Sequence, residues 1–428
     1  MFEFNDIKKL LRIKDSNIEI HSVEEERDKK GGHLVVYASL TNQVSRCPEC
    51  GQADEKTIVK NGGKHSRILL NSAGNQRTYL NLKKQRYLCR NCHSYFTAKT
   101  YLVDRFCFIA KQVFYKAFEE LTEKNTAKNI AKHCFVSSST LQKSIDLLGQ
   151  EINIKKNWLP KCLLFDEFRS LTTDKGKFAF SCMDGDTGKL FDILPSRRKN
   201  DLVDYFMSFD RQARHSVRYV VSDMNAPYLK VVKICFPNAK LIIDRFHIVQ
   251  HMNRCFDNLR VRVMKSLNQN DPAQAKQYRQ LKKLNRLLLM SHDKLDFQTF
   301  KKRANFSWSY LTQTEIVDRL LTISEDLSLG YNYYQDLIYA FNHKDGGEFY
   351  RLLNEMPEEI PAELQILKRT FRKHEAGIRL SLEKSYSNAK LENIHTHIKV
   401  LKRVAYGYRN FSNMRARIFL TNNLISIK

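Results

Sequence analysis

Residues 217–244, VRYVVSDMNAPYLKVVKICFPNAKLIID, decide the fold. Runs rich in Val and Ile at 217–222 and 239–243 predict two strands, and the segment between them has the apolar spacing of a helix. An aspartate follows each strand directly, Asp223 after the first and Asp244 after the second. Buried apolar strands that end in this way deliver their carboxylates to one edge of a sheet. The stretch therefore predicts an α/β sheet with acidic groups at one edge.

Three further strands are predicted upstream of this unit. They are, in order, CLLFDEF (162–168), KFAFSCMD (177–184) and KLFDILP (189–195), followed by a helix, DLVDYFMSF (201–209). The turn GDTG (185–188) joins the last two strands in a hairpin, so the order of elements is βββαβαβ. Asp166 ends the first strand and Asp223 the fourth, and these two strands are neighbours in a ribonuclease H-like sheet. Because side chains alternate along a strand, we expect Glu167 to point to the opposite face from Asp166.

The whole chain is strongly basic. Its 428 residues include 72 Lys or Arg against 46 Asp or Glu, a net charge of +26. Lys and Arg neutralise phosphates and release counterions, so this balance predicts a polyanionic partner, first of all nucleic acid. A basic protein without such a partner, or one on a membrane surface, is the alternative. The N-terminus has early acids and no long apolar core, and no later run reaches the about 18 apolar residues of a spanning helix. We expect a cytosolic protein, in which the ten cysteines form no disulfide framework.

Four cysteines have the spacing of metal ligands. RCPECGQ (46–52) and LCRNCHS (88–94) each contain a CxxC turn. The four thiolates are those of Cys47, Cys50, Cys89 and Cys92. Four thiolates complete the tetrahedral shell of one structural zinc ion. RTYLNLKKQRYLC (77–89) alternates apolar and basic residues, which predicts a strand and hence a small basic β-ribbon tied together by the zinc. Four unrelated buried thiols, or a redox-active CxxC pair, are the alternatives.

The segment from about 105 to 150 has helical patterns. Two short helices are predicted in TAKNIAKHCFVSSSTLQKSIDLL (126–148), with Thr126 as the N-cap of the first and a serine of 137–139 as the N-cap of the second. They resemble a helix-turn-helix in which the turn carries Phe135 where a glycine is usual. On the second helix, the candidates for contact with DNA bases are Gln142 and Lys143. A plain pair of antiparallel helices is the alternative.

The C-terminal stretch KSYSNAKLENIHTHIKVLKRVAYGYRNFSNMRAR (384–417) contains eight Lys or Arg residues and a single acid, Glu392. Its apolar residues predict a helix that ends at Gly407. Glu392 lies at the edge of the apolar stripe, where it can face the ends of the strands, and His395 and Lys399 continue its row. A surface glutamate in an intrahelical ion pair is the alternative.

Taken together, these features resemble the DDE transposases of bacterial insertion sequences, in particular the ISL-type group, whose members also begin with a zinc ribbon and a helix-turn-helix. The resemblance rests on the order zinc ribbon, helix-turn-helix, Asp, Asp, long helical insertion and Glu, and it covers nearly the whole chain. It implies that Asp166, Asp223 and Glu392 are the catalytic carboxylates. It also implies a role close to the site for Asp244 and His247, because related transposases carry a similar pair after the fifth strand. A structural hydrogen bond is the alternative for this pair.

The expected fold class is α/β and multidomain, a ribonuclease H-like catalytic domain with a large all-α insertion, preceded by a zinc ribbon and a helix-turn-helix. The expected domains are the zinc ribbon (1–100), the helix-turn-helix (101–155), the first part of the catalytic domain (156–250), the insertion (251–380) and the C-terminal helical part of the catalytic domain (381–428). Within the insertion we expect Trp308 in the core, with stacking on a base as the alternative.

Three carboxylates suit metal-assisted cleavage of a phosphodiester. Two Mg²⁺ (or Mn²⁺) ions about 3.5–4 Å apart stabilise the attacking and the leaving oxygen, and Mg²⁺ takes Asp and Glu oxygens alongside phosphate. The resemblance implies a cytoplasmic, nucleoid-associated transposase that acts as a homodimer, binds terminal inverted repeats and target DNA, and cleaves and transfers strands. The basic residues expected to hold the DNA backbone beside Glu392 are Lys399, Lys402, Arg403 and Arg409. A ribonuclease H-like nuclease or resolvase, and a catalytically silent DNA-binding regulator, are the other function classes.

Overall fold

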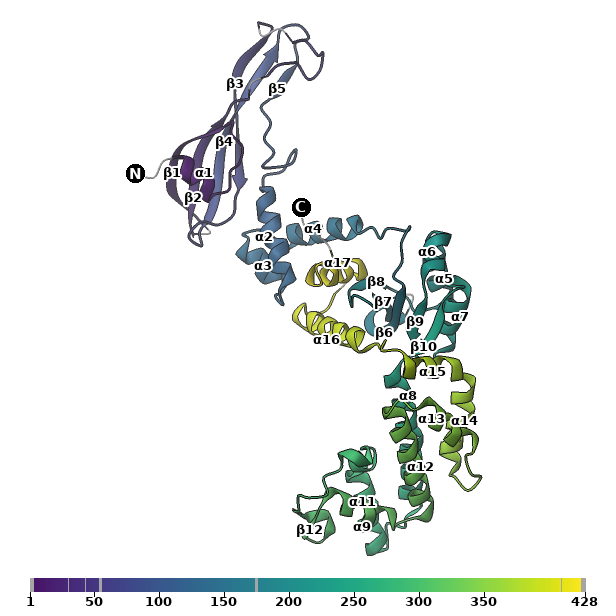
Figure 1. Ribbon diagram of the computed structural model, residues 1–428. Coiled ribbons are helices and arrows are strands. Elements are labelled where there is room, and N and C mark those ends of the chain that lie inside the picture. The colour runs from purple at the N-terminus through teal and green to yellow at the C-terminus, as the bar shows by residue number, and fades with distance from the viewer. Residues whose placement is uncertain are drawn as a thin grey trace. The chain divides into compact units, whose positions relative to one another are not determined.

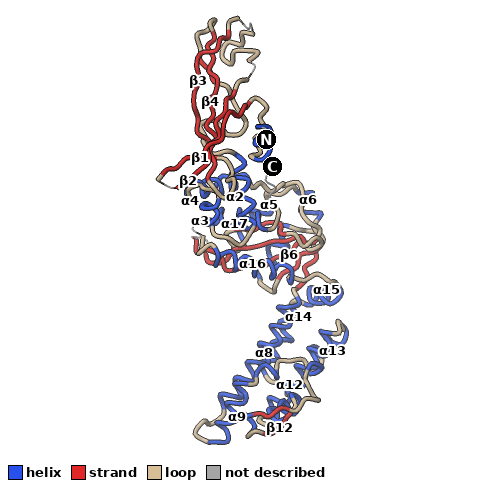
Figure 2. Tube along the Cα trace, turned by 90° about the vertical axis from the view of Figure 1, so that its left-hand side faces the viewer, coloured by secondary structure: helices blue, strands red, loops and turns tan. Residues whose placement is uncertain are grey.

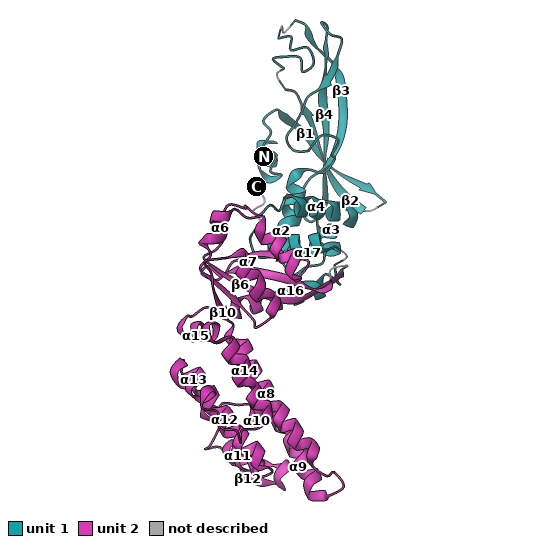
Figure 3. Ribbon diagram, turned by 90° about the vertical axis from the view of Figure 1, so that its right-hand side faces the viewer, with its two compact units in different colours: residues 1–153, 397–428 teal, residues 154–396 magenta. Residues whose placement is uncertain are grey.

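The computed structural model describes residues 4–29, 31–42, 44–53, 56–173, 176–408 and 410–424. The chain divides into two compact units, which are described separately: unit 1 is residues 1–153 with 397–428, and unit 2 is residues 154–396 (Figure 3). The boundary between them passes through helix α16 (Ala389–Val404), after Thr396.

Unit 1 begins with a five-stranded sheet. Its elements are α1 (Phe4–Leu10), β1 (Ile18–Asp28), β2 (Gly31–Leu40), β3 (Ile58–Leu69), β4 (Arg77–Cys89) and β5 (Tyr95–Thr97). The strand order is β1-β2-β4-β3, with β5 also paired to β4. Only the pair β2 and β4 is parallel among these strands. The strand predicted at 77–89 is therefore confirmed as β4, but the small ribbon expected around it is part of a larger sheet, because β2 pairs along the other side of β4.

Three helices follow the sheet in unit 1. They are α2 (Lys111–Thr122), α3 (Ala127–His133) and α4 (Ser138–Glu151). Both predicted N-caps are confirmed, since the side-chain oxygens of Thr126 and Ser137 each accept a backbone N–H three residues ahead, at 3.0 Å. Phe135 takes the place of the usual glycine in the turn with a φ of 54°, in the left-handed region that non-glycine residues adopt rarely.

The C-terminal helix α17 (Phe411–Thr421) also packs in unit 1. Its Ala416 and Leu420 join the apolar core that the sheet and α2, α3 and α4 form. Arg417 is buried and donates hydrogen bonds to the carbonyl oxygens of Glu123 and Asn125, at the start of the turn before α3. In Figure 1 this yellow helix lies beside the blue helices of the same unit. Residues 397–428, which the sequence groups with the catalytic domain, thus complete the core of the N-terminal unit.

Unit 2 contains a second five-stranded sheet. Its elements are β6 (Cys162–Thr173), β7 (Gly176–Asp184), β8 (Leu190–Leu194), α5 (Lys199–Met207), α6 (Arg211–Ser216), β9 (Tyr219–Ser222), α7 (Ala226–Cys235) and β10 (Lys240–Ile243). The strand order is β10-β9-β6-β7-β8. β10, β9 and β6 are parallel, and β7 and β8 are antiparallel to their neighbours. The predicted strands and the two longer helices are confirmed, and the short α6 is an addition. Apolar residues of α5 and α7 cover one face of this sheet.

The sequence predicts that the first strand of this sheet ends at Asp166, but β6 continues past that residue. It runs on to Thr173 because β7 pairs along it beyond that point, through Arg169 and Phe178. β9, by contrast, pairs with β6 only over Cys162–Leu164. Asp166 therefore lies just past the last residue of β6 that pairs with β9.

The insertion begins as a direct continuation of the sheet. Its elements are α8 (Arg245–Ser266), α9 (Pro272–Lys283), α10 (Asn285–Leu288), β11 (Lys301–Arg303), β12 (Ser309–Leu311), α11 (Gln313–Leu321), α12 (Glu325–Asn342), α13 (Gly346–Asn354), α14 (Ala362–Lys373) and α15 (Glu375–Glu383). α8 passes the expected boundary at residue 250 without a break. α12 packs closely on α8 at Gly330, where a Cβ would lie 2.3 Å from Leu259 Cδ2. α15 returns to the sheet beside β10.

Two expectations about the insertion are wrong. It is not all-α, since β11 and β12 form a short antiparallel pair (Figure 2). Three-residue strands carry too short an alternating pattern to stand out in the sequence. Trp308 is not in the core, because 62% of its surface is exposed. In the described part of the chain no helix is both long and apolar enough to cross a lipid bilayer.

Candidate active site and zinc centre

Asp166 is the most strongly perturbed carboxyl group of the sheet. Its Oδ1 accepts the backbone N–H of Glu167 at 2.8 Å, and 17% of its side chain is exposed. Burial raises the pKa of Asp166 to about 7; the charges of Asp223 and Asp244 act in the same direction, and the Glu167 N–H and His247 oppose them. In this setting the ionised form of a carboxyl group is disfavoured at neutral pH, unless a nearby cation stabilises it.

Asp223 and Glu392 come to the same region from other elements. Asp223 directly follows β9, and its Oδ1 accepts the backbone N–H of Asn225 at 3.0 Å. Glu392 lies in the first turn of α16. Burial raises the pKa of both groups; the charge of Glu167 adds to the effect on Asp223, and that of Asp244 to the effect on Glu392.

Asp244 interacts electrostatically with Asp166 and Glu392, and His247 interacts with all three predicted carboxylates. The electrostatic interaction with His247 lowers the pKa of Asp166, of Asp223 and of Glu392. Asp244 follows β10 at the start of α8, as predicted. Electrostatic interactions thus connect the five residues that the sequence singled out, with Glu392 connected to the others through Asp244 and His247.

Asp244 also holds the start of the helix that carries Glu392. It is 1% exposed, and its Oδ1 accepts the backbone N–H of Asn388 at 3.0 Å. Asn388 in turn donates from Nδ2 to the carbonyl oxygen of Phe165 at 2.9 Å. The other oxygens of this pair, Asp244 Oδ2 and Asn388 Oδ1, are buried and have no hydrogen-bond partner among the described residues. Buried oxygens without donors are the ligands that a hard cation takes, so this region fits Mg²⁺.

His395 is a residue of this region to which the sequence analysis gives no role at the site. It is buried, its Nδ1 lies 3.4 Å from Asp166 Oδ2, and its Nε2 lies 2.7 Å from the hydroxyl of Ser181. That hydroxyl donates to the carbonyl oxygen of Asp166 at 3.1 Å. His395 therefore joins α16 to both strands beside the carboxylate. The available signal was its place four residues after Leu391 and three before Ile398, inside the buried stripe of the helix.

Glu167 is directed to other partners, as strand alternation predicts. Its carboxylate accepts hydrogen bonds from the hydroxyl of Tyr228, at 2.9 Å, and from Arg197. Tyr228 lies on α7, whereas the contact of Asp166 is with α16. At the hairpin turn, Asp184 makes a local bond, accepting the backbone N–H of Asp186 at 3.0 Å, whereas the Asp186 carboxylate accepts from the hydroxyl of Tyr386 at 2.7 Å.

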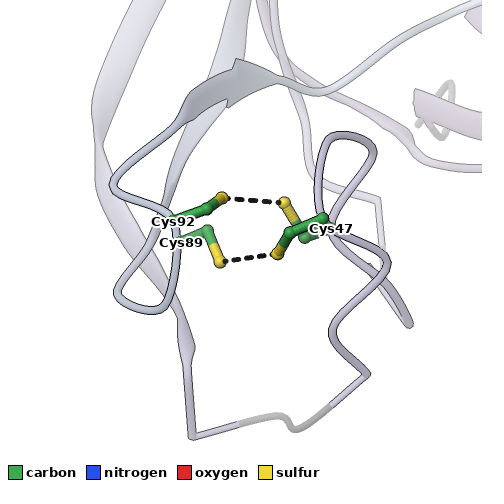
Figure 4. A group of neighbouring side chains, drawn as sticks. Cys47, Cys89 and Cys92 are labelled. Carbon is green, nitrogen blue, oxygen red and sulfur yellow. Dashed lines mark hydrogen bonds between the residues drawn. The ribbon is translucent and has the colours of Figure 1, made fainter.

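The four predicted cysteines converge at one end of the first sheet (Figure 4). The Sγ atoms of Cys47 and Cys92 lie 3.7 Å apart, and those of Cys50 and Cys89 lie 3.8 Å apart. Zinc bound to thiolates at about 2.3 Å in a tetrahedron places neighbouring sulfur atoms about 3.8 Å apart. The backbone N–H of Cys50 and the hydroxyl of Ser94 lower the pKa of Cys47 to about 6. The spacing and chemistry of these thiols fit a structural zinc ion.

Within the described residues no other group of three or more His, Cys, Asp or Glu side chains has its ligand atoms as close together as these thiols. The carboxylate oxygens of Asp166, Asp223 and Glu392 therefore do not all lie within 4.8 Å of one another.

The residues predicted to contact DNA lie on two helices. Gln142 and Lys143 are exposed on α4, where Gln142 Nε2 donates to Asp146 Oδ1 at 3.2 Å. Lys399 and Arg403 are exposed on α16, and Lys402 is half-buried there. The remaining predicted residue, Arg409, lies outside the described residues.

Comparison with known proteins decides the family. Residues 163–418 match the family model of the ISL3-type DDE transposases. The chain belongs to the ISL3 family of transposases. Residues 43–92 match a second model, the zinc finger of transposases IS204, IS1001, IS1096 and IS1165, and this segment contains the four cysteines. The ISL3 match spans the second sheet, the insertion and most of the C-terminal helices.

Two curated relatives are similar to this ISL3 chain. The transposase for insertion sequence element IS1001 of Bordetella parapertussis is 23% identical over 392 residues, which cover 89% of each chain. A Lactococcus lactis protein named ATP-dependent protease is 46% identical over 112 residues. That second match covers 26% of this chain and spans only 36% of the relative's length.

Proposed function

We propose that this ISL3 chain is a DDE transposase that binds the terminal inverted repeats of its insertion sequence and carries out two-metal-ion DNA cleavage and strand transfer. The observation that carries the proposal is that burial raises the pKa of Asp166, Asp223 and Glu392 and that all three interact electrostatically with His247. Burial of several like charges costs free energy, and a bound cation removes that cost. Carboxyl groups with pKa values perturbed in this way are typical of functional sites.

The strand order supports a ribonuclease H-like catalytic domain. In sequence order, the first strand of the second sheet lies at its centre, with the second and third on one side and the fourth and fifth on the other. Asp166 and Asp223 come from the first and fourth strands, which are adjacent. The helical insertion separates this sheet from the helix that carries Glu392.

The roles of the site residues follow from their chemistry. Mg²⁺, when bound, lowers the pKa of the attacking water or 3′-hydroxyl and stabilises the leaving 3′ oxygen. Asp166, Asp223 and Glu392 would hold the two ions. Asp244 and Asn388 fix the start of α16 and so set the height of Glu392 above the sheet. His395 keeps the Asp166 carboxylate and α16 in contact.

We also propose that unit 1 and the basic helix α16, which continues into unit 1, bind DNA. The zinc ribbon and the paired helices α3 and α4, with Gln142 and Lys143 exposed, are proposed to read the transposon ends. Lys399, Lys402 and Arg403 are proposed to hold the backbone near the carboxylates. The net charge of +26 supports a polyanionic partner. A homodimer that acts in the cytoplasm, at the nucleoid, is the arrangement we propose, because two transposon ends must be joined.

The test is incubation of the full chain with DNA that flanks its coding sequence, in Mg²⁺, followed by mapping of the nicked strand. A transposase cuts at the ends of the terminal repeats and then joins the new 3′ ends to a target. Glu392→Gln keeps the shape and removes the charge, so cleavage should fall by orders of magnitude while DNA affinity is unchanged. Cleavage of branched DNA irrespective of sequence would indicate a resolvase instead, and binding without cleavage a regulator.

A further inference from the structure

One arginine packs against the face of the second sheet that Glu167 occupies. Arg197 lies in the loop between β8 and α5, and its Nη1 donates to the Glu167 carboxylate. Its guanidinium carbon lies 4.5 Å from the centre of the Phe178 ring on β7. Glu167 pairs with Phe180 across the two strands, and Phe178 is two residues from Phe180, so Glu167 and Phe178 share one face. Arg197 therefore bridges β6 and β7 on the face opposite to Asp166.

This bridge lies where the core of that face ends. Phe180 is buried in the core with residues of α5 and α7, whereas Phe178 is 37% exposed and the Arg197 side chain is 42% exposed. The second oxygen of the Glu167 carboxylate accepts from the hydroxyl of Tyr228 at 2.9 Å. Among the described residues, the hydrogen bonds of Arg197 use Nη1 only. The guanidinium is thus fixed by a carboxylate and a ring, and its Nε and Nη2 donors are available to a ligand.

Arg197 also interacts electrostatically with Asp223. The hydrogen bond to Glu167 raises the pKa of Arg197 most, and the charges of Glu167 and Asp223 act in the same direction. A DNA strand that reaches Asp223 brings more negative charge to an edge that already holds several carboxyl groups. A cation fixed beside that edge offsets the repulsion and favours the approach of phosphate.

A purely structural ion pair is the alternative for Arg197 and Glu167. Ion pairs that are open to solvent contribute little to stability, and Glu167 already has a donor in Tyr228. A planar guanidinium with its donors held in place is, by contrast, the group that binds phosphate oxygens in pairs.

We propose that Arg197 binds a backbone phosphate of the DNA strand that is cut, while Glu167 and Phe178 hold its guanidinium in position. This inference rests on the proposed function, and it adds to that site a substrate contact from the loop between β8 and α5. Glu167 then acts on the DNA through Arg197 and not as a metal ligand, in keeping with its direction away from Asp166.

Binding of phosphate-modified transposon ends tests the proposal. The full-length, zinc-loaded protein is titrated with labelled end duplexes, with Ca²⁺ in place of Mg²⁺, and each duplex carries one uncharged methylphosphonate at a different position of the strand to be cut. For the wild type, one position near the cut should weaken binding about tenfold, because it loses the charge-assisted hydrogen bonds of Arg197. For Arg197→Ala that position should cost nothing further. This variant should bind unmodified DNA about tenfold more weakly, with a slope of log affinity against log salt smaller by about one.

Two further variants separate charge from geometry. Arg197→Lys keeps the charge and loses the planar fork, so it should restore the salt slope and only part of the affinity. Arg211→Ala is the matched control, since Arg211 is exposed on α6 of the same unit, which precedes the start of β9, whereas Asp223 follows its end. It should change neither the affinity nor the slope.

The proposal is overturned if Arg197→Ala binds as tightly as the wild type. It is also overturned if that variant binds more weakly but keeps every methylphosphonate penalty, because the ion pair is then purely structural. If the wild type does not prefer transposon ends to unrelated duplex, the proposed function fails. The salt slope of Arg197→Ala on either duplex then still decides whether Arg197 contacts a phosphate.

Discussion

Replacing Asp166 by Asn should stabilise the metal-free protein, and the effect should grow with pH. The pKa of Asp166 is about 7 in the folded state because of burial, against an ordinary value of 3.8. Below about pH 4 the group is protonated in both states and has no effect. Between pH 4 and 7 only the folded state keeps the proton, so folding stability falls as pH rises, and above pH 7 the whole cost of the buried charge is present.

The size of this cost follows from the two pKa values. A difference of about 3 units, at about 1.4 kcal/mol per unit, gives about 4 kcal/mol above pH 7. Asn has nearly the same shape and no charge, so it removes the cost. For a compact unit of the size of unit 2, a change of 1 kcal/mol in the free energy of unfolding corresponds to roughly 2–4 °C in Tm. The expected gain in Tm is therefore about 10 °C at pH 8.

Thermal unfolding at pH 5 and pH 8, with zinc retained and Mg²⁺ absent, measures the effect. The gain from Asp166→Asn should be roughly a third to a half as large at pH 5 as at pH 8, because pH 5 is only about 1.2 units above the ordinary pKa of 3.8. Added Mg²⁺ should raise the Tm of the wild type and not that of the variant, since only the wild type keeps the proposed ligand. Glu358→Gln, at an exposed acid of the same unit, is the control and should shift neither value. An equal shift at both pH values, or a lower Tm of Asp166→Asn at pH 8, would refute the reasoning.

Three further predictions concern single side chains. Cys89→Ser should release zinc, unfold the cysteine end of the first sheet and weaken binding to transposon ends; full zinc content with unchanged affinity speaks against it. Glu167→Gln should keep DNA cleavage within a few-fold, because its carboxylate serves Tyr228 and Arg197, and an inactive variant would place it among the catalytic carboxylates. His395→Ala should cost about 1–3 kcal/mol of stability and raise the Mg²⁺ concentration needed for half-maximal cleavage, with DNA affinity unchanged; an unaltered Mg²⁺ dependence would remove its positioning role.

Local signals in the sequence were sufficient for the elements around the site. Val- and Ile-rich runs found β9 and β10, and the aspartates after them lie where these strands end. Thr126 and Ser137 were identified as caps because a cap depends on bonds within three residues. The CxxC spacing likewise contains most of the geometry of the zinc site.

Features that depend on distant pairing were not predictable in the same way. β6 extends past Asp166 only because β7 pairs with it, and the first sheet extends past its ribbon only because β2 pairs with β4. The sequence places His395 only in the row of Glu392, because nothing local shows that its ring shares a hydrogen bond with Ser181, 214 residues away. The sequence predicts Trp308 in the core. Its own segment does not reveal the hydrogen bonds with α9 that hold the neighbouring residues Asn305 and Ser307.

The place of α17 in unit 1 has a consequence for chain synthesis. A ribosome that has completed residues 1–153 has made the sheet and helices α2, α3 and α4, but not Ala416, Leu420 and the Arg417 side chain that close their core. A polypeptide interrupted before Phe411 therefore leaves that core open. Truncated products of translation should then be cleared as unfolded chains and should not compete with the complete protein for its DNA.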